Sequence, residues 1–456
     1  MAKLWDKGYS IDSFMEEFTV GNDYLLDQNL IKADCIASIA HARTLHKALI
    51  LSAEELSVIE SALRAVIDLD SQNLFTITIQ DEDCHTAIES FITKRHGDVG
   101  KKIHTGRSRN DQVQTALRLW MREFSAVMAC ESAALAERLF KFAKTYEMVP
   151  MPGRTHMQLA MPSSVGLWAA AYAEELNDLV RHVLSINELL DQSPLGSAAS
   201  YGTPLPLDRQ FSAKQMGFSK VQNNVLYANN SRGKFEALLL DGCDYIGLTL
   251  SKLAQDLMFF TLDELGYFTL PRQLCTGSSI MPQKRNPDGL ELTRSRSAVV
   301  SSCSQRIKSI IRSLPSGYNR DFQDTKEPLF TGAKTALQIV RIMDLMVSNL
   351  TVNQERLLQG CRKEIYATDE VLKRLSSGGS FRDLYKSVGT DLESISAYDP
   401  VETIRSRTSS GTTGNLGLAD QSDAAAKLKR ESLRLLNQYV SAYRKLTEMD
   451  LALVVW

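Results

Sequence analysis

The sequence lacks the features that mark several common functional classes. Basic residues are not in excess, because 52 Lys and Arg stand against 54 Asp and Glu, whereas nucleic-acid-binding proteins usually carry a positive excess. The longest uncharged stretch, residues 155–173, contains His156, Pro162 and Gly166 and is therefore a poor membrane span. We expect neither a nucleic acid nor a membrane as a partner of this 456-residue chain.

Metal-ligand and cysteine motifs are equally scarce. None of the seven cysteines belongs to a C-x-x-C pair, and no histidine follows His182, so the common zinc spacings are missing. The P-loop and G-x-S-x-G patterns are also absent. An odd, scattered set of cysteines favours a reducing compartment, and the N-terminus is charged where a secretory signal would be apolar. We expect a cytoplasmic protein without a bound metal.

Glycine and proline are missing from long stretches of the chain, and both residues normally interrupt helices. Neither occurs between Gly106 and Pro150. Further stretches of this kind are 167–193, 290–314, 333–359 and 418–456. In the first stretch apolar residues recur mostly every three, four or seven positions, which is the spacing of an amphipathic helix. The best strand signal, residues 75–79, is short, so the sequence predicts an all-α fold.

Local signals predict where helices begin and how the chain divides. Residues 108–111 have the spacing of a capping box. Residues 286–288 predict an Asn N-cap before a Pro at the first helical position, and Pro315 is expected to end that helix. We predict three domains, which are shorter helices over 1–108, a long-helix bundle over 109–360 and a small unit over 361–456.

Three polar segments beside the predicted long helices contain candidate site residues. Arg109 and Asn110 begin the longest helix, where free N–H groups and an arginine suit an anion. His156 lies in the segment that joins two long helices, and a histidine is a common acid–base group. Residues 316–327 contain Tyr318, Gln323 and Lys326. From these residues alone, solvated helix caps and ordinary surface side chains are the alternative interpretation.

The most specific segment is GSSIMPQKRNPDGLEL, residues 277–292. Its Gly-Ser-Ser turn presents Ser278, and Lys284 and Asn286 bring donors to the start of the following helix. Glu291 lies about one helical turn further on. Such a group suits a carboxylate or phosphate ligand. The alternative is a glycine-rich surface loop with a basic patch.

This loop resembles the signature loop of the fumarase/aspartase superfamily. Further segments narrow the resemblance to the argininosuccinate lyase family, and they are spread over most of the chain. They are LWDKGYS (4–10), EDCH (82–85), HTGRSRNDQV (104–113), PGRTHMQ (152–158), SPLGSAA (193–199), LPSGYNRDFQ (314–323) and FRDLYKSVG (381–389). The similarity extends from Leu4 to about Gly417.

The resemblance implies a fold, an assembly and a reaction. The fold would be all-helical with three domains, and the central helices would form a twenty-helix core in a homotetramer. The reaction would be a C–N lyase reaction, the reversible β-elimination of argininosuccinate to arginine and fumarate, without a metal or an organic cofactor. The alternatives are another fumarate-releasing lyase of the superfamily and a non-catalytic structural protein like the δ-crystallins.

The resemblance also implies roles for residues at matching positions. Ser278 matches the loop serine proposed as the base, and His156, paired with Glu291, matches the other acid/base candidate. Lys284 and Asn286 would bind the substrate carboxylate and the aci-carboxylate formed from it. The matching substrate-binding positions are Asp27, Arg109, Asn110, Thr155, Tyr318, Gln323 and Lys326. Asp27 is expected to reach the arginine half of the substrate.

Helix geometry predicts that the active site is shared between subunits. A helix over residues 109–147 would be about 58 Å long at about 1.5 Å per residue. Arg109 at its start and His156 beyond its end therefore cannot touch one substrate on the order of 10–15 Å long, because long helices curve only gently. We expect an obligate oligomer. Near the substrate's arginine end the chain departs from the family pattern, with Asp23 where a serine is common.

Overall fold

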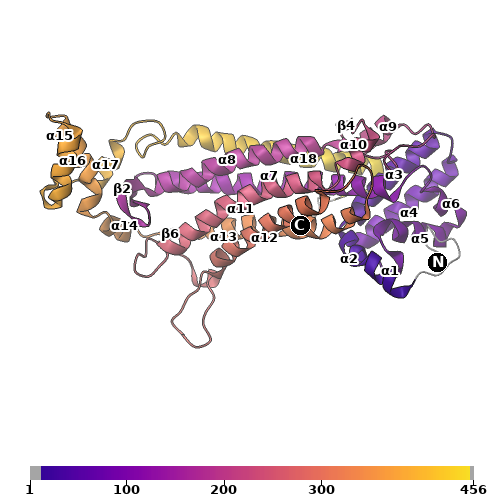
Figure 1. Cartoon of the computed structure of the whole chain (residues 1–456), viewed down its shortest axis with the longest axis horizontal. Coiled ribbons are helices and arrows are strands. Elements are labelled where there is room, and N and C mark those ends of the chain that lie inside the picture. Colours follow the sequence, from indigo (N-terminus) through magenta and orange to yellow (C-terminus); the bar gives the residue numbers. More distant parts are fainter. Residues whose placement is uncertain (1–11, 452–456) are drawn as a thin grey trace.

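The protein is elongated, and its long helices run along the long axis (Figure 1). This computed structural model describes residues 12–451, so the segment LWDKGYS lies outside the described residues. Helices account for most of the described residues, and the strands are short. The all-α prediction is confirmed. No helix in residues 12–451 is both long and apolar enough to cross a bilayer.

The N-terminal helices lie together at the right-hand end of Figure 1. They are α1 (Ser13–Val20), α2 (Asp23–Leu26), α3 (Ile31–Lys47), α4 (Ala53–Ser71), α5 (Cys84–His96) and α6 (Asp98–Lys102). Polar side chains set where two of them begin. Ser52 and Glu55 form a capping box at α4, and the Asp83 carboxylate accepts the N–H of Thr86 at α5. The cap of α5 places the EDCH motif at the first turn of that helix.

The long helices form the central bundle. They are α7 (Arg109–Thr145), α8 (Val165–Leu190), α11 (Lys234–Phe260), α12 (Asp288–Ile311), α13 (Lys326–Ser348) and α18 (Leu418–Thr447). α7 packs lengthwise against α8 and α18, and α11 packs against α12. Each stretch without glycine and proline contains a long helix, as predicted.

Short elements connect the bundle helices. The helices are α9 (Arg209–Gln215), α10 (Val225–Asn230), α14 (Gln354–Gly360), α15 (Ala367–Leu375), α16 (Phe381–Thr390) and α17 (Pro400–Arg405). The strands are β1 (Pro150–Thr155), β2 (Gln158–Ser164), β3 (Gln192–Ser193), β4 (Lys220–Val221), β5 (Phe268–Thr269) and β6 (Thr351–Val352). β1 and β2 form an antiparallel hairpin between α7 and α8, β3 and β4 pair in parallel, and β5 and β6 pair antiparallel.

The helix-start predictions have mixed outcomes. The capping box is confirmed, because Ser108 Oγ accepts the N–H of Asn110 and the Asp111 carboxylate accepts the N–H of Ser108. The predicted Asn286 N-cap is wrong, since α12 begins at Asp288. The helix ends at Ile311, before Pro315. The backbone of Asn286 pairs instead with Thr276. That pairing closes a loop, and Pro287 stands at the N-cap position of α12 without a side-chain cap bond.

Residue patterns gave a misleading signal at two further places, the strand signal at residues 75–79 and the glycines inside α11. Residues 75–79 form no strand, because the side chain of Gln28 bonds to Phe75 O and to Ile77 N in place of a partner strand. α11 is a long helix despite Gly242 and Gly247. A Cβ at Gly242 would lie 2.8 Å from Ile186 Cδ1 on α8. Glycine here allows close helix packing rather than ending the helix.

A buried arginine ties the bundle together near the middle of α7. Arg122 is fully buried, and its guanidinium donates to Asp191 at 2.8 Å, to Met216 O at 2.9 Å and to Tyr443 Oη at 3.1 Å. It also lies over the ring of Tyr439, 4.1 Å from the centroid. The contacts join α7 to the residue after α8 and to α18. The C-terminal end of α8 and the helix α18 therefore both contact α7 at Arg122.

The C-terminal part of the chain contributes to two hydrophobic cores. α15, α16 and their neighbours have a small core of their own, which includes Ile365, Val371 and Val388. The buried side chains of α18, by contrast, belong to the core of the bundle. The predicted unit over 361–456 therefore includes a helix that packs with the bundle, and the three domain boundaries stay a prediction.

Gly166, in the first turn of α8, fixes how that helix meets the end of α7. A Cβ at this position would lie 2.6 Å from the Cα of Glu147, and backbone cannot give way cheaply. We predict that Gly166→Ala lowers the free energy of unfolding by about 1–3 kcal/mol, the usual cost of overpacking. The control is Gly389→Ala in α16, where the added methyl meets nothing within 4 Å. Equal thermal unfolding curves for the two variants would show that the close approach of α8 to Glu147 does not make a methyl group at residue 166 destabilising.

Candidate active site

The structure brings five of the predicted site residues into one cavity of about 450 Å³. It lies at the N-terminal end of α7, beside α5 and the 3₁₀ turn Arg320–Thr325. The predicted residues that line it are Arg109, Asn110, Tyr318, Gln323 and Lys326. The first two come from the start of α7 and the others from residues 318–326. Residues far apart in sequence thus form a single polar pocket.

Arg109 is held by acidic and hydroxyl side chains from the EDCH region. Its guanidinium lies 3.1 Å from Glu82, 3.4 Å from Asp83 and 3.0 Å from Thr86 Oγ1. Burial lowers the pKa of Arg109, but these carboxylates raise it and prevail. The guanidinium is therefore charged and fixed in place beside the cavity. Two residues of the EDCH motif, Glu82 and Asp83, therefore hold Arg109 in position.

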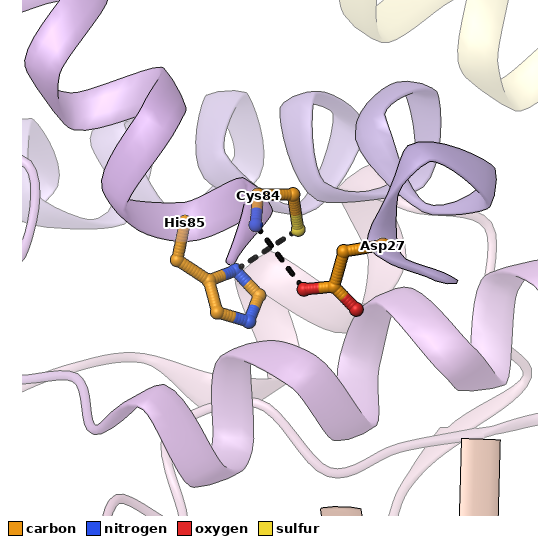
Figure 2. A group of neighbouring side chains, drawn as sticks. All are labelled: Asp27, Cys84 and His85. Carbon is orange, nitrogen blue, oxygen red and sulfur yellow. Dashed lines mark hydrogen bonds between the residues drawn. The ribbon is translucent and has the colours of Figure 1, made fainter. Parts of the chain in front are cut away.

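Lys326 lies between two carboxylates at the floor of the pocket. Its Nζ donates to Asp23 at 2.8 Å and to Asp27 at 2.6 Å, and Asp27 also accepts the N–H of Cys84 at 3.1 Å (Figure 2). Burial raises the pKa of Asp23 to about 6, against the effect of Lys326. Asp27 is fully buried and does not line the cavity. Asp27 bonds to Lys326, which does line the cavity.

The turn that carries Gln323 closes the pocket from the side of α1. Gln323 Nε2 donates to the backbone oxygens of Thr19 at 3.1 Å and Val20 at 3.2 Å. Arg320 donates to the same Thr19 oxygen at 2.8 Å. These bonds use the free carbonyls at the C-terminal end of α1. Gln323 therefore couples α1 to the pocket, while Tyr318 stays 39% exposed at its rim.

A buried histidine at the pocket was not assigned a role from the sequence. The Nδ1 atom of His85 bonds to Asp34, and Nε2 has no hydrogen-bond partner within residues 12–451. Burial lowers the pKa of His85, but the Asp34 carboxylate raises it and prevails. Burial raises the pKa of Asp34, but His85 lowers it and prevails. A charged pair results, and His85 lines the cavity. One signal was available, since histidine is rare in this chain and the EDCH motif contains one.

Asp27, Cys84 and His85 lie close enough together to hold a metal ion, with ligand atoms within 4.8 Å of one another (Figure 2). The Asp27 carboxylate and His85 Nδ1 already have other partners. Asp27 accepts from Lys326 and from the Cys84 N–H, and His85 Nδ1 bonds to Asp34. Burial raises the pKa of the Cys84 thiol well above its usual value, whereas a metal ligand must be a thiolate. The group suits a hydrogen-bonded network better than a metal centre.

Thr155 and His156 lie at the other end of α7, on the turn between β1 and β2. His156 and Met157 both have positive φ, 52° and 64°, which is the backbone of a tight two-residue hairpin turn. Both Thr155 and His156 are exposed. The predicted pairing of His156 with Glu291 does not occur within the described residues of one chain, where no bond joins the two side chains.

Ser278, Lys284, Asn286 and Glu291 lie in or just after a third segment, the loop before α12. Backbone hydrogen bonds of 2.9 Å in both directions between Thr276 and Asn286 close this loop. Ser278 Oγ accepts the N–H groups of residues 280 and 281 at 3.3 and 3.1 Å. The loop, which projects at the bottom of Figure 1, therefore holds the serine oxygen in a nest of N–H donors.

One chain does not bring these three groups together. α7 has 37 residues and is about 55 Å long at about 1.5 Å per residue, so the pocket and the hairpin lie at opposite ends of it (Figure 1). α12 has 24 residues and separates the serine loop from residue 318 by about 36 Å. A complete site would need more than one chain.

The chain is similar to known lyases. A family model described as "Lyase" matches residues 8–301. The chain is 42% identical over 386 residues to a protein named argininosuccinate lyase from Thermotoga neapolitana, which covers 85% of this chain and 97% of that protein. EDDS lyase in complex with formate has a TM-score of 0.77 at 21% identity, covering 97% and 94%. Class II fumarase from Schistosoma mansoni has a TM-score of 0.70 at 19% identity, covering 85% and 94%. The two structures confirm the predicted all-α fold.

Replacing Asp34 with Asn removes the carboxylate that keeps His85 charged. We predict a loss of about 3–5 kcal/mol in the free energy of unfolding near neutral pH, as for other broken buried pairs. The raised pKa of His85 means that its share of stability is lost as pH rises through that value. The lowered pKa of Asp34 means that its share is lost as pH falls through that value. Urea unfolding should be measured for the parent and for Asp34→Asn over a pH series. The difference in unfolding free energy between the two proteins should be largest at pH values that lie between these two pKa values.

The matched control for this series is Asp263→Asn, at an exposed position without an ion pair in the described residues. Its unfolding free energy should follow that of the parent protein at every pH. A difference between parent and Asp34→Asn that is constant with pH would contradict the charged pair.

Proposed function

Because the chain belongs to the lyase family, and within it to the argininosuccinate lyases, we propose that it cleaves argininosuccinate reversibly to arginine and fumarate. The substrate is a small molecule, and the reaction breaks a C–N bond by β-elimination. The observation that carries the chemical proposal is the environment of Ser278, whose oxygen accepts two backbone N–H groups. The sequence motifs and the similarity to curated relatives support the same reaction.

Ser278 acts as the base that removes the proton from the carbon beside a substrate carboxylate. A serine oxygen is basic only as an alkoxide, and N–H donors together with a nearby cation stabilise that form. The N–H groups of residues 280 and 281 are such donors, and Lys284 follows three residues later in the same closed loop. Removing the proton places a second negative charge on the carboxylate. Lys284 and Asn286 stabilise this aci-carboxylate.

His156 is the second acid/base group, and Glu291 is the carboxylate that orients it. Both side chains are exposed in the single chain, which leaves them able to meet a partner subunit. The tight turn of the hairpin holds Thr155 and His156 at the tip of a rigid element. Thr155 contributes a hydroxyl to the substrate from the same turn. A histidine with a carboxylate partner suits proton transfer near neutral pH.

The pocket at the start of α7 binds the substrate through its fixed donors. Arg109, Asn110, Tyr318 and Gln323 present polar atoms to the cavity, and Lys326 presents an ammonium held by two carboxylates. Two carboxylates around one lysine keep it charged although it is buried. Asp27 acts in substrate binding through Lys326, which it holds at 2.6 Å.

The active protein is a homotetramer in which each site combines residues from different subunits. The length of α7 and α12 supports this assembly, because the three groups of site residues lie too far apart within one chain. Large apolar side chains are also exposed along the bundle helices. They are Leu238, Tyr245 and Leu248 on α11, Leu292 and Val299 on α12, and Leu345 on α13. Residues seven positions apart share a helix face, so these side chains suit burial against other copies.

The compartment that we propose is the cytoplasm. All seven cysteines are free thiols in the structure, and this is the usual state of cysteine in a reducing compartment.

Ser278→Ala tests the proposed base. We predict that turnover of argininosuccinate falls about 10²–10⁴-fold, the usual cost of losing a general base, while the fold is unchanged because the serine lies in a surface loop. The assay follows the appearance of fumarate spectrophotometrically. Ser279→Ala is the matched control, since its side chain has no hydrogen bond in the described loop, and it should keep most of the activity. Near-normal turnover by Ser278→Ala would rule out this residue as the base. Absence of fumarate release by the parent protein would favour a structural role or another substrate.

Arg109→Ala and His156→Asn test the shared site. Each variant alone should be inactive, because every site then lacks one group. In mixed tetramers made by co-expression, some sites combine an intact pocket from one variant with an intact hairpin from the other. We predict that part of the activity returns in these hybrids, measured as fumarate release after their isolation by paired affinity tags. Isolated hybrids that stay inactive would contradict the shared site or one of the two assignments.

A further inference from the structure

A second polar cavity lies at the end of the bundle opposite the substrate pocket. It is formed where the hairpin β1–β2, the segment before β5 and α14 meet, at the left of Figure 1. Its volume is about 400 Å³. The charged and polar side chains that line it include Arg154, Gln158, Glu264, Arg356, Gln359 and Arg362. The substrate pocket and the serine loop contribute no residue to it.

The charges around this cavity are not balanced. Three arginines face one carboxylate, that of Glu264, which leaves an excess of two positive charges. No ion pair or hydrogen bond engages the side chains of Glu264, Arg356 or Arg362 within residues 12–451. Arg109, by contrast, is paired with Glu82. Unpaired guanidinium groups gathered at one cavity repel each other, and a bound anion removes that repulsion.

Arg154 offers the cavity a donor that is already held in place. Its Nη1 donates to Met157 O at 3.0 Å, and the face of its guanidinium lies over the ring of Phe259, 5.2 Å from the centroid. Its Nε is buried and lacks a hydrogen-bond partner in the part of the chain that the structure describes. A buried N–H without an acceptor costs free energy.

The cavity wall beside the arginines consists of closely packed residues. Tyr267 is 3% exposed, and its backbone oxygen accepts the N–H of Asn353 at 2.8 Å. The hydroxyl of Tyr267 lies where a Cβ of Gly360 would be, only 2.3 Å from that position. Glycine at 360 therefore leaves room for this hydroxyl at the cavity. The cavity is shaped by packed residues and not by a loose loop.

We propose that this cavity binds a small dianion with several oxygen acceptors, such as a phosphate group, through Arg154, Arg356 and Arg362. A guanidinium donates two parallel hydrogen bonds to such a group. The excess of two positive charges, counted with Glu264, matches the charge of a dianion. The cavity has room for a group of this size. This site is separate from the proposed catalytic residues and does not depend on their assignment.

The ligand would also stabilise the adjacent hairpin turn. Arg154 bonds to Met157 O, which belongs to the turn that carries Thr155 and His156. An anion that bonds to the guanidinium of Arg154 restrains this side chain. Occupation of the cavity should therefore slow hydrogen exchange of the turn amides.

Isothermal titration calorimetry on the full-length protein tests the site, with inorganic phosphate as the titrant at constant ionic strength set by chloride. We expect saturable binding of phosphate. In Arg356→Gln/Arg362→Gln the affinity should fall at least about tenfold, because two charge-assisted contacts are lost. Both arginines are exposed and unpaired, so the fold should be retained, and thermal unfolding without phosphate checks this. Arg382→Gln, which removes one exposed arginine from α16 outside the cavity, should bind phosphate like the parent.

A parallel titration with malonate separates two sources of the same dianionic chemistry. Tighter binding of phosphate identifies a phosphate or phosphorylated ligand, and tighter binding of malonate identifies a dicarboxylate. The proposal is overturned if neither anion binds saturably, or if the double variant binds as tightly as the parent. Unchanged exchange of the hairpin amides at saturating ligand would overturn the link to the turn.

Discussion

The length of α7 is the constraint on which the arrangement of the candidate site depends. As one helix of 37 residues it keeps Arg109 and the hairpin turn about 55 Å apart. Its neighbours keep it straight, because α8 and α18 pack along it (Figure 1). Arg122 bonds from its middle to Asp191 and Tyr443. A helix supported along its length cannot bend its ends together, and this is the reason that we propose a site shared between subunits.

The two ends of the bundle differ in how their proposed ligand-binding cations are paired. In the pocket at the start of α7, Arg109 and Lys326 have carboxylate partners, which are Glu82 for the arginine and Asp23 and Asp27 for the lysine. Burying ions costs free energy that pairing only partly returns, so this network is better explained by positioning than by stability. At the hairpin end, Arg356 and Arg362 are exposed and unpaired, and water solvates them. Paired cations suit a site whose geometry is preset, whereas unpaired cations suit an anion that binds from solution.

Glycine illustrates why single residues were hard to interpret in the sequence. The absence of glycine correctly predicted α7, because an uninterrupted amphipathic stretch favours one helix. The presence of Gly242 did not end α11, because that glycine lets α8 approach. Gly166 similarly lets the start of α8 meet the backbone of Glu147. The residue type shows that something unusual occurs at a position, and only the packing shows what it is.

By itself, the sequence determined the features that arise between residues a few positions apart. These are the capping box at Ser108 and the long helices, which follow from spacing along the chain. Only the tertiary structure decided which distant residues meet. Asp27 and Lys326 are 299 positions apart and lie 2.6 Å from each other, and His85 bonds to Asp34 across 51 positions. Such pairs depend on how the helices pack, and the pattern of residues along one helix does not specify the partner on another.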